Sequence, residues 1–131
     1  MGESVGTWIW PWLAVALGGS VGAVLRYGIS DWIQKQHQQP WPLGTLTVNV
    51  IGCCAIGLAM AWVDRGSMGP EARLFWVTGM LGALTTFSTF GWDTLVLLRS
   101  GWIFEAFCNV AANTLIGLGA VVLGFHLGRY F

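Results

Sequence analysis

Charged residues are scarce in this chain, and no run of basic side chains occurs. Charged side chains make up 9% of its 131 residues, six basic against six acidic, so the formal net charge is zero. The missing basic patch argues against nucleic-acid binding by a charged surface. Hydrophobic residues account for 55% of the chain. This combination argues against a soluble globule and predicts an integral membrane protein.

Sequence signatures of catalysis are also missing. The chain has no P-loop, dinucleotide-binding fingerprint, HExxH helix or nucleophile elbow, so we predict a protein that is not an enzyme. Its three cysteines, Cys53, Cys54 and Cys108, lie in apolar runs without a Cys–His cluster, and we interpret them as packing residues. No basic stretch precedes the first apolar run, which indicates a first membrane span rather than a signal peptide.

Four apolar runs occupy almost the whole chain. A membrane-spanning helix needs about 20 apolar residues, and runs of about this length cover residues 8–33, 43–63, 74–98 and 102–127. Polar segments rich in prolines or glycines, typical of turns, follow the first and second runs. We therefore predict an all-α membrane protein with one domain over residues 1–131 and four transmembrane helices.

The third run contains a polar insert. Residues 79–90 read GMLGALTTFSTF, with two glycines and four hydroxyl residues. Lipid cannot satisfy free backbone groups, so irregular or polar backbone at this depth is buried in protein or lines a hydrated path. We predict that the third helix is broken near residues 82–86, and that the break forms a site for an ion or small solute.

Amides and aromatic rings accompany this insert. Asn49, Asn109 and Asn113 each bring two N–H donors into an apolar run. They either form a ladder of donors for an anion or join helices by hydrogen bonds. An amide also has an acceptor, so the amides alone do not determine the sign of the ion. Phe87 and Phe90 share one helix face, where they either offer weakly positive ring edges to an anion or simply pack.

The hydroxyl groups and carbonyls of the insert have similar alternatives. Thr85, Thr86, Ser88 and Thr89 can donate hydrogen bonds to a solute, or they can bond back to the preceding helical turn. A break would also free main-chain carbonyls near Gly82 and Thr85. Such oxygens could coordinate a hard cation.

Two ionisable residues lie within the predicted spans. Asp93 stands about one turn beyond Phe90 and is either functional or a residue that reaches toward the membrane interface. Arg26 follows Gly18 and Gly22 at intervals of four residues. It either attracts anions to a pore mouth or anchors to headgroups. The two glycines at this spacing allow another backbone to approach closely.

Positive charge is balanced between the two ends of the predicted bundle, because four spans put both termini on one side. The basic residues are three on each side: Arg65, Arg73 and Arg129 with the termini, and Arg26, Lys35 and Arg99 opposite. Positive residues in short loops set orientation, so this balance predicts insertion in both orientations and an antiparallel dimer. The alternative is a weakly biased protein that is oriented by other means.

Three sequence blocks carry a family resemblance: residues 18–27 (GGSVGAVLRY), 44–52 (GTLTVNVIG) and 79–90. With these blocks in order over nearly the whole chain, the protein resembles the CrcB/Fluc fluoride channels. The resemblance implies a fluoride-selective, passive ion channel that exports fluoride across the bacterial inner membrane. It also implies an antiparallel, dual-topology homodimer with two fluoride pathways.

The resemblance implies roles for individual residues of the pathways. Asn49, Phe87 and Phe90 would line them, and the hydroxyls of Ser88 and Thr89 would belong to the same polar track. These side chains suit fluoride, a small and strongly hydrated anion whose water must be replaced by close hydrogen-bond donors. Binding by weak ring edges would remain loose enough for the ion to leave.

A structural sodium ion is the implied cofactor of such a dimer. It would lie at the centre, bound by the main-chain carbonyls of Gly82 and Thr85 from both subunits. Arg26 would lie near the pore entrance. Asn109 and Asn113 would extend the polar track in the fourth span.

Two other functions fit a small four-span protein. A small multidrug-resistance-type antiporter needs a membrane-embedded carboxylate in its first span, and none lies between Trp8 and Ser30. A non-transporting assembly subunit has no use for the signature from Thr85 to Phe90, and vesicles containing it would retain fluoride. Because no ionisable group with a clear shuttle role lies in mid-span, we prefer passive flow over proton-coupled transport.

Overall fold

The computed structural model describes residues 5–37 and 40–131, and every regular element within these ranges is helical. In chain order the elements are α1 (Val5–Gln36), α2 (Leu43–Asp64), α3 (Pro70–Arg73), the π-helical segment η1 (Leu74–Leu81), α4 (Gly82–Leu84), α5 (Phe87–Arg99) and α6 (Ile103–Tyr130). Four helical stretches are long and apolar enough to cross a membrane: Ile9–Gln36, Leu43–Asp64, Pro70–Arg99 and Ile103–Tyr130. The prediction of an all-α protein with four long apolar helices is confirmed.

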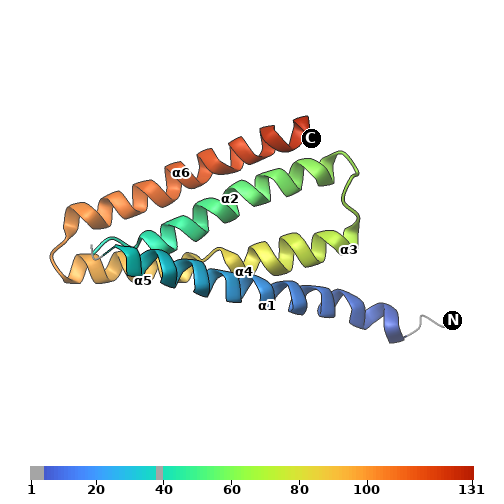
Figure 1. Ribbon diagram of the computed structural model, residues 1–131, viewed down its shortest axis with the longest axis horizontal. Coiled ribbons are helices and arrows are strands. Elements are labelled where there is room, and N and C mark those ends of the chain that lie inside the picture. Colours follow the sequence, from blue (N-terminus) through green and yellow to red (C-terminus); the bar gives the residue numbers. More distant parts are fainter. Residues whose placement is uncertain (1–4, 38–39) are drawn as a thin grey trace.

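The helices form an elongated bundle of two main pairs (Figure 1). α2 packs along α6, while α1 packs along η1 and α4. The start of α1 and the end of α6 lie at the same end of the bundle, beside the turn between α2 and α3. The end of α1, the start of α2 and the turn between α5 and α6 lie at the opposite end.

Glycines let the paired helices approach backbone to backbone. A Cβ atom at Gly18 would collide with the carbonyl oxygen of Phe75, and one at Gly22 would collide with that of Met80. Both partners belong to η1, so the predicted small-residue face of the first span is a close helix contact. Gly124 of α6 meets the main chain of α2 in the same way.

The third stretch is interrupted over a shorter segment than the sequence predicts. The helix continues through Leu84 and resumes at Phe87. Between them, Thr85 (φ −80°, ψ 154°) and Thr86 (φ −148°, ψ 121°) have extended backbone, and we call these two residues the irregular segment. The stretch bends only slightly at this point (Figure 1). A third helix broken into separate halves near 82–86 is therefore not confirmed, and the π-helical geometry of η1 has no counterpart in the sequence prediction.

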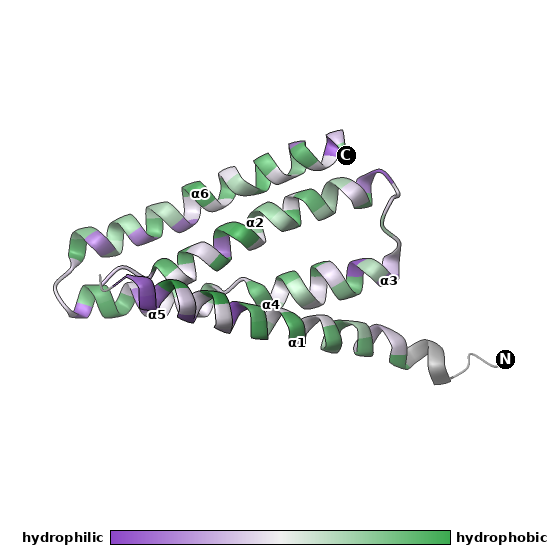
Figure 2. Ribbon diagram, viewed as in Figure 1, coloured by the Kyte–Doolittle hydropathy of each residue, from purple (hydrophilic) through white to green (hydrophobic). Residues whose placement is uncertain are grey.

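Apolar side chains cover much of the outside of the bundle (Figure 2). Trp12 is 78% exposed, Phe87 83% and Leu115 70%, on three different helices. The more hydrophilic residues lie near the helix ends and at scattered positions along the helices (Figure 2). A soluble monomer rarely exposes so much contiguous apolar surface, whereas lipid would cover it. The surface supports a multi-pass membrane protein.

Candidate functional site

Thr86, the second residue of the irregular segment, is the N-cap of α5. Its Oγ1 accepts a hydrogen bond from the Thr89 main-chain N–H (3.2 Å) and donates one to Thr89 Oγ1 (3.1 Å). Threonine is favoured here because its oxygen satisfies a free N–H of the first helical turn. The Ser88 hydroxyl lies 3.3 Å from the same oxygen. These hydroxyls therefore form a local cluster that starts α5.

Asn49, in the middle of α2, binds the main chain of Thr86 from the side. Its Oδ1 accepts from the Thr86 N–H at 2.8 Å, and its Nδ2 donates to the Thr86 carbonyl at 3.2 Å. Extended backbone within a membrane-length stretch has no helical partners, and leaving its polar groups unpaired away from water is costly. One amide thus supplies both partners that Thr86 needs and ties α2 to the start of α5.

The three asparagines form one continuous series of hydrogen bonds. Asn49 Nδ2 donates to Asn113 Oδ1 (2.9 Å), and Asn113 Nδ2 donates to both Oδ1 and the main-chain carbonyl of Asn109 (3.0 Å each). Asn109 Nδ2 donates to Thr94 Oγ1 (2.9 Å), and the Thr94 hydroxyl donates to the Phe90 carbonyl (2.8 Å). We call Asn49, Asn113, Asn109 and Thr94 the amide series. It joins α2, α6 and α5.

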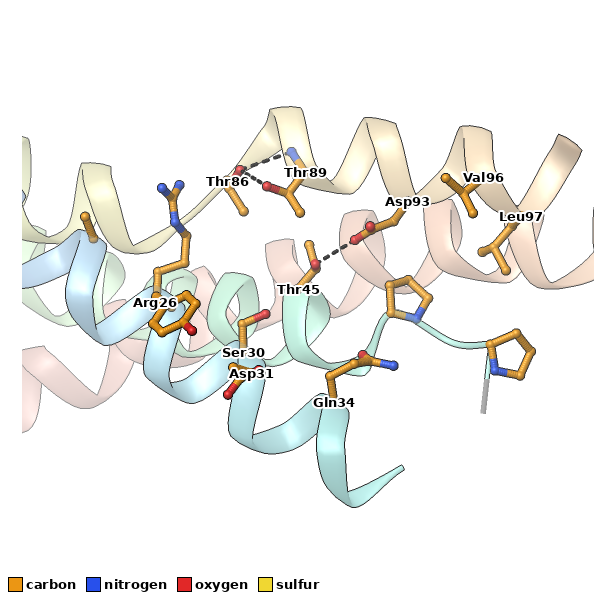
Figure 3. Close-up of a pocket in the computed structure, with 14 residues that line it drawn as sticks. Arg26, Ser30, Asp31, Gln34, Thr45, Thr86, Thr89, Asp93, Val96 and Leu97 are labelled. Carbon is orange, nitrogen blue, oxygen red and sulfur yellow. Dashed lines mark hydrogen bonds between the residues drawn. The ribbon is translucent and has the colours of Figure 1, made fainter. Parts of the chain in front are cut away.

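Two open cavities share Thr86 as a lining residue. The first, of about 540 Å³, is lined by the ionisable residues Arg26, Tyr27, Asp31 and Asp93. In Figure 3 the Arg26 side chain points toward the irregular segment. Thr45 is 5% exposed, and its Oγ1 donates to Asp93 Oδ2 at 2.6 Å. This inward contact favours a functional Asp93 over a side chain that reaches for the headgroups.

The second cavity, of about 450 Å³, is mostly apolar and is lined by Asn49, Asn113, Phe87 and Phe90. The two phenyl rings have centroids 5.4 Å apart and planes inclined by 59°. Phe87 is 83% exposed, so its ring does not serve packing within one copy of the chain. Asn49, the exposed ring of Phe87 and the partly buried ring of Phe90 therefore border the same space.

The predicted site residues divide between these cavities. Arg26 and Thr89 line the first, whereas Asn49, Gly82, Thr85, Phe87, Phe90 and Asn113 line the second. Ser88 and Asn109 line neither cavity. Asn109 is 1% exposed, so its amide is held inside the bundle. Direct contact of Ser88 or Asn109 with an ion stays a prediction.

Free carbonyl oxygens lie where α4 ends. The N–H and the hydroxyl of Thr85 both donate to the Leu81 carbonyl, at 3.2 Å and 3.1 Å. Because the Thr86 N–H is bound to Asn49, the Gly82 carbonyl receives no N–H from the following turn. Main-chain oxygens of this kind suit a hard cation. In residues 5–37 and 40–131, no group of three or more His, Cys, Asp and Glu side chains could hold a metal.

Two threonines have structural roles that the sequence reasoning did not assign. Thr86 caps α5 and receives Asn49, and Thr94 ends the amide series. A threonine just before a helical run is a recognised start signal, so the cap at Thr86 could have been found from the sequence. No local pattern identifies Thr94, because its partner Asn109 lies on another helix.

Comparison with known proteins agrees with the sequence resemblance. Residues 13–125 match a family model described as CrcB-like protein, Camphor Resistance (CrcB). The chain belongs to this CrcB family. A fluoride-specific ion channel FluC from Chloroflexus aurantiacus is 43% identical over 120 residues, which cover 91% of this chain and 95% of that protein.

Two further relatives have the same name, fluoride-specific ion channel FluC. The protein from Parabacteroides distasonis is 42% identical over 113 residues, covering 86% of this chain and 88% of its own. The protein from Thermus thermophilus is 40% identical over 117 residues, covering 89% and 92%. These relatives are named as ion channels, a non-enzymatic function, in agreement with the prediction from the missing motifs.

Proposed function

We propose that this CrcB protein is a fluoride-selective channel that lets the ion leave the cell passively across the bacterial inner membrane. Its relatives are named fluoride-specific ion channels, and four of its helical stretches can cross a membrane. The observation that carries the proposal is the second cavity, where the Asn49 amide and the rings of Phe87 and Phe90 border one space. Donors and ring edges together suit a small anion that must exchange its water for weak, close contacts.

The irregular segment separates two helix ends of opposite polarity, which supports a site for ions. α5 begins at Phe87, and the N–H groups of its first turn favour an anion. The preceding stretch ends at Leu84 with free carbonyls that favour a cation. The proposed fluoride pathway comprises Asn49, Phe87, Ser88, Thr89, Phe90 and Asn113.

A second copy of the chain, inserted in the opposite orientation, is the proposed cover of the second cavity. The cavity wall is mostly apolar, Phe87 stands exposed on it, and the basic residues are balanced between the bundle ends. Gly82 and Thr85, whose main-chain carbonyl oxygens are the proposed ligands, line the same cavity. Pairing two copies there would bring both sets of oxygens to one structural sodium ion, in keeping with the oxygen ligands that hard cations prefer.

The first cavity is the proposed pore entrance. Its guanidinium group, Arg26, attracts anions, whereas the carboxylates of Asp31 and Asp93 line the same cavity and repel them. Asp93 accepts a hydrogen bond from Thr45. The two carboxylates would therefore moderate the attraction of Arg26 for fluoride.

Liposomes loaded with fluoride test the proposal directly. Purified protein should release fluoride to an external electrode while retaining chloride, and protein-free liposomes should release neither. Release without any pH gradient separates passive flow from a proton-coupled antiporter. Liposomes with protein that retain their fluoride contradict the proposal and favour a non-transporting assembly subunit.

The proposed sodium ion has its own test. Protein prepared with a bulky organic cation in place of sodium should release fluoride more slowly, and returning sodium should restore the rate. Equal rates with and without sodium would contradict a structural role for this ion at Gly82 and Thr85, while leaving the fluoride pathway untouched.

A further inference from the structure

The hydrogen bonds of the amide series can run in only one direction, and the end of the series at Asn49 shows why. The main-chain N–H of Thr86 can only donate, so Asn49 must turn Oδ1 toward it. Asn49 Nδ2 then faces Asn113, which must accept through its own Oδ1. Asn113 Nδ2 consequently faces Asn109. The two ends of an amide are usually distinguished only by such surroundings, and here a main-chain group distinguishes them.

The end of the series at Thr94 independently requires the same direction of hydrogen bonding. The Phe90 carbonyl can only accept, so the Thr94 hydroxyl donates to it and the Thr94 oxygen accepts from Asn109 Nδ2. Asn109 Oδ1 is then the atom that accepts from Asn113, which agrees with the direction required at Asn49. Turning any single amide would place two donors or two acceptors face to face. The whole series therefore acts as one oriented unit.

Both amide hydrogens of Asn49 have protein acceptors. One bonds to Asn113 Oδ1 at 2.9 Å and the other to the Thr86 carbonyl at 3.2 Å. No buried side-chain nitrogen or oxygen in the described part of the chain lacks a partner. An anion that accepts from Asn49 must therefore replace one of these two oxygens. This exchange keeps net binding weak, because a hydrogen bond is lost for each one gained.

We propose that Asn109 and Thr94 are positioning residues of the fluoride pathway, which hold Asn113 with its oxygen toward Asn49 and so reinforce, from the far end of the series, the orientation that the Thr86 main chain gives the Asn49 donors. In this proposal Asn109, which the resemblance placed in the polar track itself, acts on the ion through Asn113, because it is 1% exposed and lines neither cavity. This inference rests on the proposed function, since the pathway that the series serves is the fluoride pathway.

A pair of threonine variants tests the proposal in liposomes. Thr94→Val removes the anchor of the series and should slow fluoride release about three- to tenfold, as expected for one lost hydrogen bond. Thr94→Ser keeps the hydroxyl and should restore the rate. Thr47→Val is the matched control, because Thr47 makes the same backward bond, to the Leu43 carbonyl at 2.7 Å, but forms no side-chain hydrogen bond with an asparagine. Its rate should stay within about twofold of the parent.

Asn109→Leu extends the series of variants to the amide itself. It removes the hydrogen bond that Asn109 Nδ2 donates to Thr94 and the one that Asn109 Oδ1 accepts from Asn113 Nδ2, while the side chain keeps a similar branched shape. It should slow release like Thr94→Val. Folded Thr94→Val and Asn109→Leu proteins that release fluoride at the parent rate would overturn the positioning role.

A spectroscopic readout follows the series without relying on transport. The chain has only three asparagines, so ¹⁵N-asparagine labelling gives three side-chain amide signal pairs in NMR spectra. Fluoride, but not chloride, should shift the pairs of Asn49 and Asn113 and, through the series, that of Asn109. Thr94→Val should move the Asn49 pair although the two residues are not in contact, whereas Thr47→Val should not.

The two readouts separate the positioning role from the proposed function. An Asn49 pair that does not move in Thr94→Val, or an Asn109 pair that ignores fluoride while Asn49 and Asn113 respond, overturns the positioning role. Parent protein that retains fluoride in liposomes overturns the proposed function, even where Thr94→Val still moves the Asn49 pair. If Thr94→Val does not fold, the fluoride titration of the parent decides.

Discussion

The contact between α1 and η1 and the amide series join helices in opposite ways. In the first, Gly18, Gly22 and Gly79 bring two backbones together with no room for a Cβ atom. In the second, side-chain amides connect α2, α6 and α5 by directed hydrogen bonds. Shape governs the first contact and hydrogen-bond polarity governs the second. Added volume should therefore damage the first most, and a changed donor or acceptor should damage the second most.

The largest effect is expected where volume is added to the glycine contact. Gly22→Ala should lower the stability of the folded protein by about 1–3 kcal/mol, because the new methyl group meets the Met80 carbonyl. Gly28→Ala is the matched control on the same helix, since nothing lies within 4 Å of its Cβ position. Alanine there should be neutral or stabilising by up to about 1 kcal/mol. Thermal unfolding in detergent measures the stability of both variants. Equal melting temperatures would contradict the view that shape governs the contact between α1 and η1.

A change of polarity in the amide series should come next, with folding largely kept. Asn49→Asp still accepts from the Thr86 N–H but loses both donors and adds a negative charge beside the anion path. Fluoride release should fall by about tenfold or more, since charged groups without partners are costly away from water. Gln36→Glu makes the same chemical change at an exposed position and should leave the rate unchanged. Release at the parent rate from Asn49→Asp would mean that Asn49 donates nothing to the ion.

Ring replacement should have a smaller effect on the second cavity. Phe87→Ile and Phe90→Ile remove the aromatic edges and should each change fluoride release about two- to tenfold, since contacts with ring edges are worth about a kilocalorie per mole. Phe104→Ile is the control, because Phe104 is 73% exposed and lines neither cavity. Electrode traces at equal protein density give the comparison. If both ring variants released fluoride at the parent rate, the two rings would serve packing between copies of the chain and not the ion pathway.

Neutralising Asp93 in the first cavity should have the smallest effect. Asp93→Asn keeps an acceptor for the Thr45 hydroxyl, so folding should not change. Removing a negative charge near the entrance should raise fluoride release by up to about threefold at low salt, and less at high salt because ions screen the charge. A large loss of release, with the protein folded, would instead make the carboxylate a required part of the path.

The outline of the fold and much of the site follow from local sequence patterns. The four apolar runs appear as helices within a few residues of the predicted limits, because hydropathy over about 20 residues is a local property. The spacing of Gly18 and Gly22 predicted a close contact for the same reason, since residues four apart share a helix face. The insert at residues 79–90 marked the place of the irregular segment, but its extent was overestimated.

The pairing of polar groups could not be predicted in the same way. Asn49, Asn109 and Asn113 looked equivalent, yet Asn49 and Asn113 line a cavity whereas Asn109 is buried. Thr86 was one hydroxyl among four, yet it alone receives the Asn49 amide and lines both cavities. These differences depend on the rotation of α2, α5 and α6 about their axes. The sequence of one helix does not predict how the neighbouring helices are rotated about their axes.

The sequence alone predicted that the protein lies in a membrane, that it has four long helices, and where polar backbone interrupts the third. These features follow from composition and periodicity, which are properties of a single segment. The tertiary structure alone decided which amide meets which backbone group and in which direction each hydrogen bond runs. The physical reason is that a hydrogen bond needs two groups within about 3 Å and correctly aimed, and only the packing of separate helices brings them there.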